Sequence, residues 1–376
     1  MMAARTFTDE QLIDALKTMT NAEAARHFKC SKRNLESRRA NLRRKGWSPE
    51  HDMIHTVPDG YRIRGVSSLY KKGEAEPVLQ WVKSSADLDR QREIMEGAIA
   101  AMAADLPQLP PRAALGTYLH DLHTVYPLGD QHIGEYIWAA ECGKSWDLEI
   151  ATKVHCGAIN ELVSLAPASA EATIIDLGDA QHFDSLEAVT PRSGHLLDAD
   201  GRYPKVVDVS VMIMRQCIES ALTKHREVNV ICVPGNHNPS GAFWMSTVLH
   251  HMYANEPRVR VDREPSLFRY FEFGKCLVGV HHGHSCKPDR LPAVMATDQS
   301  KAWGRTEHRY WYMGHVHHQN VKEHPGCIVE SFNTLVPGDS YAHSGGWRSK
   351  ENMKAIVLHR EHGEVIRHTV NADMFR

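Results

Sequence analysis

Five short stretches of this sequence place aspartate, histidine or asparagine directly after an apolar run, close to a glycine. They read PLGDQHIG, DLGDAQHFD, VPGNHN, VHHGHS and MGHVHH, and they begin at residues 127, 176, 233, 280 and 313. Carboxylate, imidazole and amide donors suit manganese, iron or zinc better than calcium. A pair separated by one residue, such as Asp130 and His132 or His315 and His317, can bring two ligands to one metal cluster from a single turn.

Each stretch alone is weak support for a metal site. Histidine makes up 25 of the 376 residues, so a histidine-rich loop is the alternative for any one of them. All five, however, follow an apolar run typical of a buried strand. The carboxyl ends of strands are where open α/β sheets place their sites. The joint pattern therefore predicts one metal centre built from five turns.

The elements that must position these turns alternate along the chain. Apolar, strand-like runs occur at 123–129, 172–178, 229–235, 276–283, 309–314, 326–333 and 355–360. The clearest helical stretches lie around 145–166 and 205–225. This alternation predicts an α/β architecture in which helices cover the sheets. We place this domain at 112–376, after a small β-hairpin, a helix around 86–104 and a proline-rich linker that together span 51–111.

Residues 1–50 have a different character. They carry 11 lysines and arginines against 6 acidic residues, a net charge of +5. Three short helical patterns with a tight turn before the third predict a small all-α helix-turn-helix domain, although Lys29 stands where that turn often has glycine. The cations predicted to contact DNA are Lys32, Arg33, Arg38, Arg39, Arg43 and Arg44. A solvated helix face or a protein-docking module are the alternatives.

The bulk composition limits the remaining classes. The formal net charge of −2 argues against a protein that coats nucleic acid over its whole surface. No stretch of about 18 apolar residues occurs, so we expect no membrane span and a cytoplasmic protein. The eight cysteines form no CxxC pair, which favours reduced thiols over a disulfide framework or a zinc ribbon.

With these motifs, residues 120–345 resemble the calcineurin-like metallophosphoesterase superfamily. The resemblance implies a two-sheet β-sandwich flanked by helices, with two divalent ions at one edge. We expect manganese first, with iron, zinc or nickel as alternatives. Carried over by position, one ion would be held by Asp130, His132, Asp179 and His317. The other would be held by Asp179, Asn236, His282 and His315, so that Asp179 bridges the two.

The resemblance also implies a mechanism. The two ions would activate water for attack on phosphorus, and His237 would protonate the leaving oxygen as general acid. A structural histidine is the alternative role for His237. We expect His281 to be packed away from the site, Asp176 to face away from it, and Asp184 to orient a ligand histidine.

The substrate is less narrowly defined. An insertion at 186–205 supplies Arg192, Arg202 and Lys205, which can bind phosphate. The alternative is that the insertion is an ordered surface or dimerisation loop. His284 and His318 can line the pocket. The layout is similar to phage and prophage phosphoesterases related to SbcD-type nucleases, which would act in the cytoplasm of a bacterial host.

We therefore expect a metal-dependent phosphodiesterase acting as a DNA nuclease. The alternatives are a phosphatase or small-molecule phosphodiesterase, and a DNA-binding regulatory protein whose phosphoesterase domain is not a nuclease. The expected partner is DNA, with a second copy of the chain or a phage or host protein as further candidates.

Overall fold

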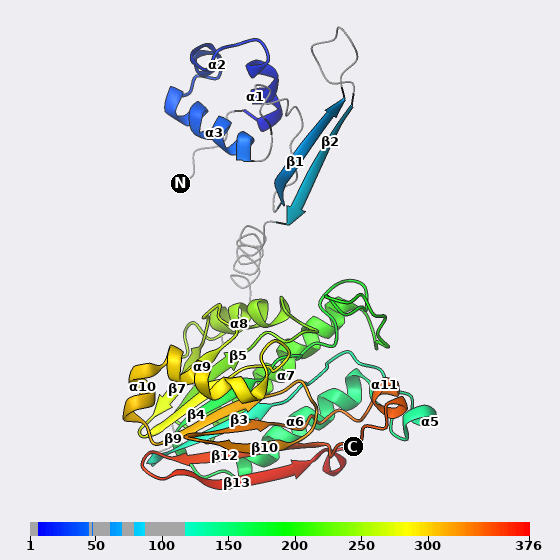
Figure 1. Ribbon diagram of the computed structural model, residues 1–376, viewed down its shortest axis with the longest axis vertical. Helices are drawn as coiled ribbons and strands as arrows, with labels where there is room; N and C mark the ends of the chain where they lie inside the picture. Colours follow the sequence, from blue (N-terminus) through cyan, green and yellow to red (C-terminus); the bar gives the residue numbers. More distant parts are fainter. Residues whose placement is uncertain (1–6, 45–46, 48–60, 70–78, 87–116) are drawn as a thin grey trace. The chain divides into compact units, whose positions relative to one another are not determined.

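The computed structural model describes residues 7–44, 47, 61–69, 79–86 and 117–376. The chain divides into two compact units, Met1–Ala98 and Ile99–Arg376 (Figure 1). Most of the helix predicted around 86–104 and the proline-rich linker lie outside the described residues. Among the described residues, no helix is long and apolar enough to cross a membrane.

Three helices form the start of the first unit: α1 (Asp9–Leu16), α2 (Asn21–His27) and α3 (Lys32–Arg44). Thr8 and Thr20 each begin a helix with a capping box, in which the threonine and a residue three positions later satisfy each other's backbone N–H. Leu12, Leu35 and Leu42 are buried between the helices. The three predicted helices are confirmed in number and order. Their helix-turn-helix class stays a prediction.

Lys29 occupies the turn between α2 and α3 with φ of 49°. This is the left-handed region, which glycine adopts at least cost. Lys29 thus replaces the glycine that is common in this turn but adopts the backbone conformation that glycine favours. The first unit also contains the antiparallel pair β1 (Tyr61–Leu69) and β2 (Leu79–Ala86), which confirms the predicted small β structure.

Two mixed sheets form the second unit. The six-stranded sheet has the order β13-β12-β3-β4-β5-β6 and the five-stranded sheet the order β10-β11-β9-β8-β7. The strands of the first are β3 (Leu119–Leu128), β4 (Ser169–Asp176), β5 (Glu227–Cys232), β6 (Val259–Val261), β12 (Asn352–His359) and β13 (Gly363–Asn371). Those of the second are β7 (Arg269–Phe273), β8 (Cys276–Val280), β9 (His308–Met313), β10 (Asn320–His324) and β11 (Cys327–Ser331). Strands β3 to β6 are parallel, as are β8, β9 and β11.

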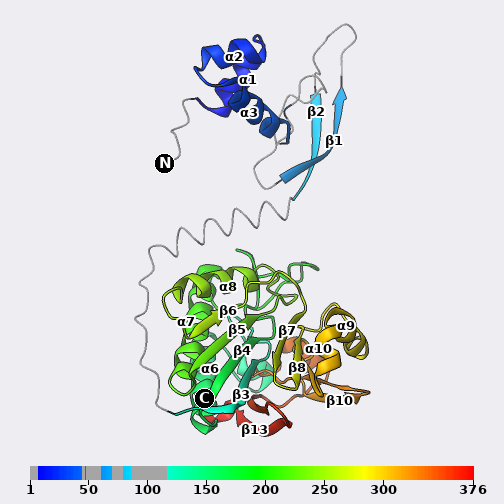
Figure 2. The same ribbon diagram turned by 90° about the vertical axis from the view of Figure 1, so that its left-hand side faces the viewer.

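Helices cover the outer faces of both sheets, as Figure 2 shows. On the six-stranded sheet lie α6 (Leu148–Leu165), α7 (Tyr203–Leu222) and α8 (Gly241–Met252), and on the five-stranded sheet lie α9 (Leu291–Asp298) and α10 (Ser300–Arg305). The short elements are α5 (Ala139–Cys142), η2 (Pro288–Arg290), α11 (Ser340–Ser344) and η3 (Ala372–Met374).

The core between the sheets is apolar. It includes Val125, Ile175, Val278, Tyr312 and Ile356, contributed by β3, β4, β8, β9 and β12. Two further clusters fill the spaces between each sheet and its helices. The predicted architecture, a two-sheet sandwich flanked by helices, is confirmed for the second unit.

Candidate metal centre

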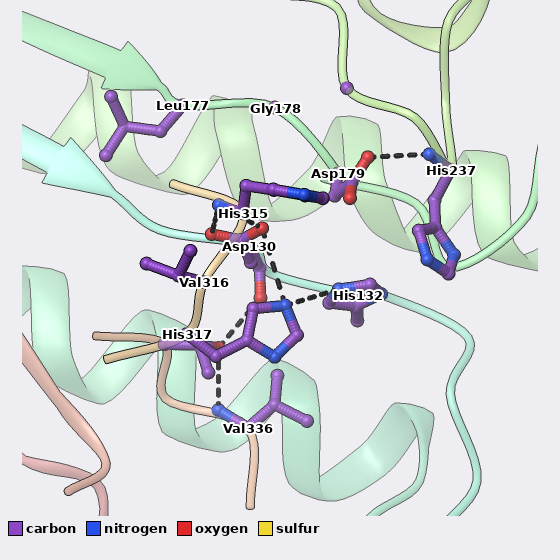
Figure 3. Close-up of polar contacts among 12 residues, drawn as sticks. Asp130, His132, Leu177, Gly178, Asp179, His237, His315, Val316, His317 and Val336 are labelled. Atoms are coloured by element: carbon purple, nitrogen blue, oxygen red, sulfur yellow. Dashed lines mark hydrogen bonds and ion pairs between the residues drawn. The ribbon is translucent and has the colours of Figure 1, made fainter. Parts of the chain in front are cut away.

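The five predicted turns meet at one edge of the sandwich. Each follows the carboxyl end of a different strand: β3, β4 and β5 in one sheet, β8 and β9 in the other. Because these strands run parallel within each sheet, their ends lie on the same side. Figure 3 shows Asp130 and His132 from the turn after β3, Asp179 from the turn after β4, and His315 and His317 from the turn after β9.

Asp130, His132 and His317 form a first group of metal-ligating side chains. The Nε2 atoms of His132 and His317 face each other at 3.2 Å, and His317 Nε2 lies 3.5 Å from a carboxylate oxygen of Asp130. Asp130 and His132 are buried, whereas His317 sits at the rim with 43% of its side chain exposed. Two of the three side chains in this group are therefore buried, and the third is accessible to solvent.

Asp179, His282 and His315 form a second group. The Nε2 atom of His282 lies 3.1 Å from Asp179 Oδ2 and 3.1 Å from Asn236 Oδ1. The other ring nitrogen, Nδ1, donates to the Leu177 carbonyl at 2.8 Å, which turns Nε2 toward Asp179 and Asn236. All seven predicted ligands therefore lie in one site. The structure places Asp179 in this group, and its bridging role stays a prediction.

The backbone of the site is strained at the same residues. Among the described residues, six non-glycine residues have φ in the left-handed region, and five are predicted ligands. These five are Asp130, His132, Asp179, His315 and His317, with φ between 28° and 71°. Such conformations are costly and persist where the surrounding structure enforces them, often at functional sites. The turns therefore keep a costly backbone conformation at the residues whose side chains form the site.

Glycines allow the turns to pack against one another. A Cβ at Gly178 would lie 2.5 Å from the His282 ring, and one at Gly314 would lie 2.5 Å from the Asp130 carboxylate. Gly178 and Gly314 thus each leave room for a ligand from another strand, whereas a Cβ at Gly129 would lie 2.5 Å from the Asn333 carbonyl oxygen. This is the physical reason for glycine before Asp179 and before His315.

Charge coupling within the site is strong. Burial alone would lower the pKa of His282, but the Asp179 carboxylate beside it raises that pKa to about 9. Burial likewise opposes protonation of His317, and Asp130 raises its pKa to about 9. Burial would raise the pKa of Asp179, yet His282, His237 and His132 hold it below its ordinary value. The Asp130 and Asp179 carboxylates therefore favour positive charge beside them, which is what the binding of a divalent ion requires.

The donor set fits a metal ion on its own geometry. The Nε2 atoms of His132 and His317 face each other at 3.2 Å, so without an ion they can share only one proton between their two lone pairs. One ion about 2.1 Å from each nitrogen would use both lone pairs. Oxygen from Asp130, Asp179 and Asn236 with nitrogen from the histidines is a mixed set suited to manganese, iron or zinc.

His237 lies beside the first group. Its ring centroid is 4.7 Å from that of His132, and its backbone N–H donates to Asp179 Oδ1 at 2.7 Å. Its Nδ1 atom donates to the His182 carbonyl at 2.8 Å. This contact leaves Nε2 as the nitrogen that can exchange a proton with a ligand.

His182 is a part of the site that the sequence analysis missed. Its Nδ1 atom lies 3.0 Å from His132 Nδ1 and 3.8 Å from Glu135 Oε2. Burial, together with Asp339 and Asp198, raises the pKa of Glu135 to about 8, although nearby His317 opposes this. His182 thus contacts a predicted ligand through its ring and His237 through its carbonyl. The only sequence signal was its place three residues after Asp179.

Asn238 and Thr334 were missed as well. The Asn238 side chain accepts from the Asp179 N–H at 2.9 Å and donates to Gln181 at 2.8 Å. Thr334 donates to the Asp130 carbonyl at 2.7 Å. These buried contacts fix the two strained turns. The second asparagine of GNHN was the one available sequence signal for this role.

Three expectations about neighbouring residues can be compared with the structure. His281 is buried, stacks on Phe268 and contacts Ser285, so it is packed as predicted. Asp176 is buried beneath the second turn, where it accepts from the Gly178 N–H and is not among the grouped ligands. The expectation for Asp184 was wrong.

Asp184 orients no ligand histidine. Its carboxylate accepts from the N–H groups of Ser240 and Gly241, at 2.6 and 3.3 Å, and from the Tyr203 hydroxyl at 3.1 Å. The first N–H groups of a helix lack partners within the helix. Asp184 therefore caps the start of α8 instead.

The predicted substrate-contacting residues differ in placement. Burial is the main cause that lowers the pKa of His284, and the charges of His282, His315 and Arg192 add to it while Asp179 opposes it. Arg192 itself is exposed. Arg202 and Lys205 are exposed at the start of α7. His318 is exposed and its ring contacts the Val316 carbonyl.

The cations of α3 fall into two groups, those that contact other residues of the first unit and those that are exposed. Arg38 pairs with Asp9 at 2.5 Å and lies over the Phe7 ring, and Arg39 donates to Asn21 at 2.9 Å. These two side chains are therefore engaged inside the first unit. Lys32 and Arg33 are exposed, while Arg43 is exposed with interactions of its own. Contact with DNA stays a prediction for all of them.

No protein-family model matches the sequence, and no curated protein matches it. Solved structures show distant similarity. Vps29 of Chaetomium thermophilum is 12% identical with a TM-score of 0.32, covering 66% of this chain and 97% of that one. A predicted phosphoesterase of Streptococcus pneumoniae is 11% identical with a TM-score of 0.27, covering 66% and 98%. A 5'-nucleotidase of Candida albicans is 9% identical with a TM-score of 0.31, covering 70% and 54%. At these scores the chemistry must follow from the site itself.

Proposed function

We propose that this chain is a metal-dependent phosphodiesterase that cleaves nucleic acid, most directly DNA. The observation that supports this best is the strained backbone of Asp130, His132, Asp179, His315 and His317 at one edge of the sandwich. Strain of this kind is maintained at functional sites. Two adjoining groups of oxygen and nitrogen donors are the arrangement that a pair of divalent ions requires.

The residues have separate roles in this proposal. Asp130, His132, Asp179 and His317 would hold one ion, and Asp179, Asn236, His282 and His315 would hold the other, as the sequence analysis predicts. Bound ions of this type neutralise charge on a phosphate and lower the pKa of water toward neutrality. His237 donates from Nδ1 to the His182 carbonyl, so Nε2 is the ring nitrogen that is available to give a proton to the leaving oxygen.

Two features favour a nucleic acid over a small phosphoester. Lys32 and Arg33 project from α3 into solvent, where cations can neutralise backbone phosphates. Arg192 is exposed, and its charge contributes to lowering the pKa of His284. In this proposal the first unit binds DNA and so raises the effective concentration of phosphodiester at a site with little sequence preference.

Hydrolysis assays test the proposal. With Mn²⁺ we expect cleavage of single-stranded or double-stranded DNA, and turnover of bis-p-nitrophenyl phosphate. Asp179→Ala should abolish both activities, whereas His120→Ala, an exposed residue in β3, should retain them. Activity retained in Asp179→Ala would refute the metal centre. Turnover of the small diester without cleavage of DNA or RNA would replace the nuclease with a small-molecule phosphodiesterase.

The role of His237 has its own test. A p-nitrophenolate leaves without needing a proton, whereas the alkoxide of a nucleotide needs one. His237→Ala should therefore reduce DNA cleavage by roughly 100-fold or more while changing p-nitrophenyl ester turnover much less. Equal losses on both substrates would show that His237 positions Asp179 or the substrate and does not act as the acid.

A further inference from the structure

A pocket of about 270 Å³ opens beside the segment that leaves the metal centre. Its walls include Tyr136 and Trp138 from that segment, Glu141 from α5, Asp198 from the 186–205 insertion and Ser340 from α11. Pockets for whole ligands run from about 300 Å³ upward. This one therefore suits one part of a larger molecule.

Tyr136 and Trp138 lie on the same exposed face of an extended segment. Burial alternates along this extended segment: Glu135 and Ile137 are buried, while Tyr136 and Trp138 are exposed. Backbone bridges to Ala199 and Trp146 hold the segment extended. Residues two apart on extended chain share a face and lie about 6.6 Å apart. That is about twice the 3.4 Å spacing of stacked bases, which leaves room for one planar ring between two others.

Two strongly exposed aromatic side chains line this pocket, and two more lie in or just after α11, which supplies Ser340 to its wall. Within the described part of the second unit, the strongly exposed tyrosines and tryptophans are Tyr136, Trp138, Tyr341 and Trp347, at 47, 60, 70 and 57%. Tyr341 follows Ser340 in α11, and the Trp347 ring lies 5.1 Å from the Tyr341 ring. Apolar rings left in water at one place favour a ligand that stacks on them.

The pocket carries negative charge, which favours the base of a nucleotide over its phosphate. Glu141 and Asp198 are exposed carboxylates that line it. They repel a phosphate and accept hydrogen bonds from amino groups, such as those on the edges of cytosine, adenine and guanine. The phosphate of a bound nucleotide is thus directed to the metal centre, and its base to the pocket.

The distance between the two sites suits one nucleotide or two adjacent ones. Tyr136 is four residues after His132, which spans at most about 14 Å of chain. Between them, Glu135 turns toward the metal centre, 3.8 Å from His182, while Tyr136 turns toward the pocket. One short segment therefore contributes a ligand to the metal centre and a wall to the pocket.

We propose that this pocket is a nucleobase-binding subsite, which holds the base of a nucleotide whose phosphodiester lies at the metal centre. Trp138 and Tyr136 stack on the base, and Asp198 and Glu141 accept from its amino group. The substrate is then a phosphodiester that carries a base with an amino group near the cleaved bond. This inference rests on the proposed function for the place of the phosphate but not for the binding of the base.

Binding without catalysis tests the subsite directly. In EDTA, 2-aminopurine riboside 5'-monophosphate should lose fluorescence when its base stacks in the pocket. Trp138→Ala should weaken this binding by roughly 5- to 100-fold. Trp81→Ala, an exposed tryptophan of the first unit, should leave it unchanged. Equal affinity in wild type and Trp138→Ala, with unchanged melting temperatures, would overturn the proposal.

Selectivity tests the carboxylates. Cytidine 5'-monophosphate should compete with the probe about tenfold better than uridine 5'-monophosphate, which has a carbonyl where cytosine has its amino group. Asp198→Asn together with Glu141→Gln should remove that preference. No preference in the wild type would overturn the hydrogen-bonding part of the proposal.

Hydrolysis separates failure of the subsite from failure of the proposed function. Trp138→Ala should raise KM for cytidine 5'-(p-nitrophenyl phosphate) and leave methyl p-nitrophenyl phosphate unaffected. If neither ester is hydrolysed by the wild type but the probe still binds, the proposed function fails and the subsite stands. If Trp138→Ala changes only the mass of the protein in light scattering, the aromatic cluster contacts a second copy and the subsite is refuted.

Discussion

A Cβ atom on Gly235 would lie 1.9 Å from Oδ1 of Asp179. The turn after β5 and the turn after β4 can therefore meet only because residue 235 is glycine. The same oxygen accepts the backbone N–H of His237 at 2.7 Å. Gly235 thus sets how closely the predicted general acid approaches a predicted metal ligand.

Replacing Gly235 with alanine should displace Asp179 and weaken the site. We expect Gly235→Ala to reduce Mn²⁺ affinity in calorimetry by roughly 10- to 100-fold, the loss typical when support of a ligand is removed. Gly304→Ala in α10 is the matched control, since no heavy atom would lie within 4 Å of its Cβ. The control should bind Mn²⁺ normally and be unchanged or more stable by about 0.5–1 kcal/mol. Normal Mn²⁺ binding in Gly235→Ala would contradict this account of the turn.

The ligands could be predicted from sequence because each lies in a short turn directly after a buried strand. Asp130 and His317, for example, are each recognisable within a few residues of their own strand. His182 and Asn238 could not be predicted in the same way. Their roles depend on contacts with His132 and Asp179, which are 50 and 59 residues away in the chain. Asp184 was misjudged for the same reason, because its partners start α8, a helix that the sequence analysis did not identify.

The fold was predictable where strands are buried. All seven strand-like runs became strands, because continuous apolar sequence is the signal of a strand covered on both faces. The chain's edge strands gave no such signal: β10, Asn320–His324, is mostly exposed and reads as polar loop. The base pocket was not foreseen either, since Asp198 and Ser340 reach Tyr136 only through tertiary folding.

His317 and His318 are neighbours with opposite expected roles. His317 faces His132 in the metal centre, whereas the His318 ring contacts the Val316 carbonyl and is exposed. Mn²⁺ at about 100 times its dissociation constant should stabilise the wild type by about 2.7 kcal/mol, because ligands that bind the folded state favour it. His317→Ala should lose most of this gain in thermal melts and His318→Ala should keep it. Equal gains in both variants would argue against His317 as a ligand.

His155 should make the protein sensitive to mild acid. It is buried in α6, and burial lowers its pKa to about 4 even though its ring contacts the Ala151 carbonyl. The unfolded chain, with a histidine pKa near 6.5, then binds more protons than the folded one between these values. Stability is therefore fully present above about pH 6.5 and is lost as pH falls toward 4, by up to roughly 3 kcal/mol for this residue.

His155→Leu tests that expectation. In urea unfolding at pH 7, 6 and 5, the variant should lose stability less steeply with falling pH than the wild type. His120→Gln, at an exposed position of β3, should follow the wild-type curve. A variant whose pH dependence parallels the wild type would show that His155 takes no part in the acid response.

Arg33 and Arg38 separate binding from folding in the first unit. Arg33 is exposed, so Arg33→Ala should leave the melting temperature unchanged. If it contacts phosphate, the variant should weaken DNA binding and flatten the dependence of log affinity on log salt by about 0.9.

Arg38 pairs with Asp9 and covers the Phe7 ring at 4.0 Å, so Arg38→Ala should destabilise the helices by roughly 1 kcal/mol. Fluorescence anisotropy with a labelled duplex at several salt concentrations measures binding, and helical circular dichroism measures folding. If Arg33→Ala leaves both affinity and salt slope unchanged while Arg38→Ala alters only folding, then α3 does not face DNA at Arg33. The docking-module alternative for the first unit would then replace DNA delivery.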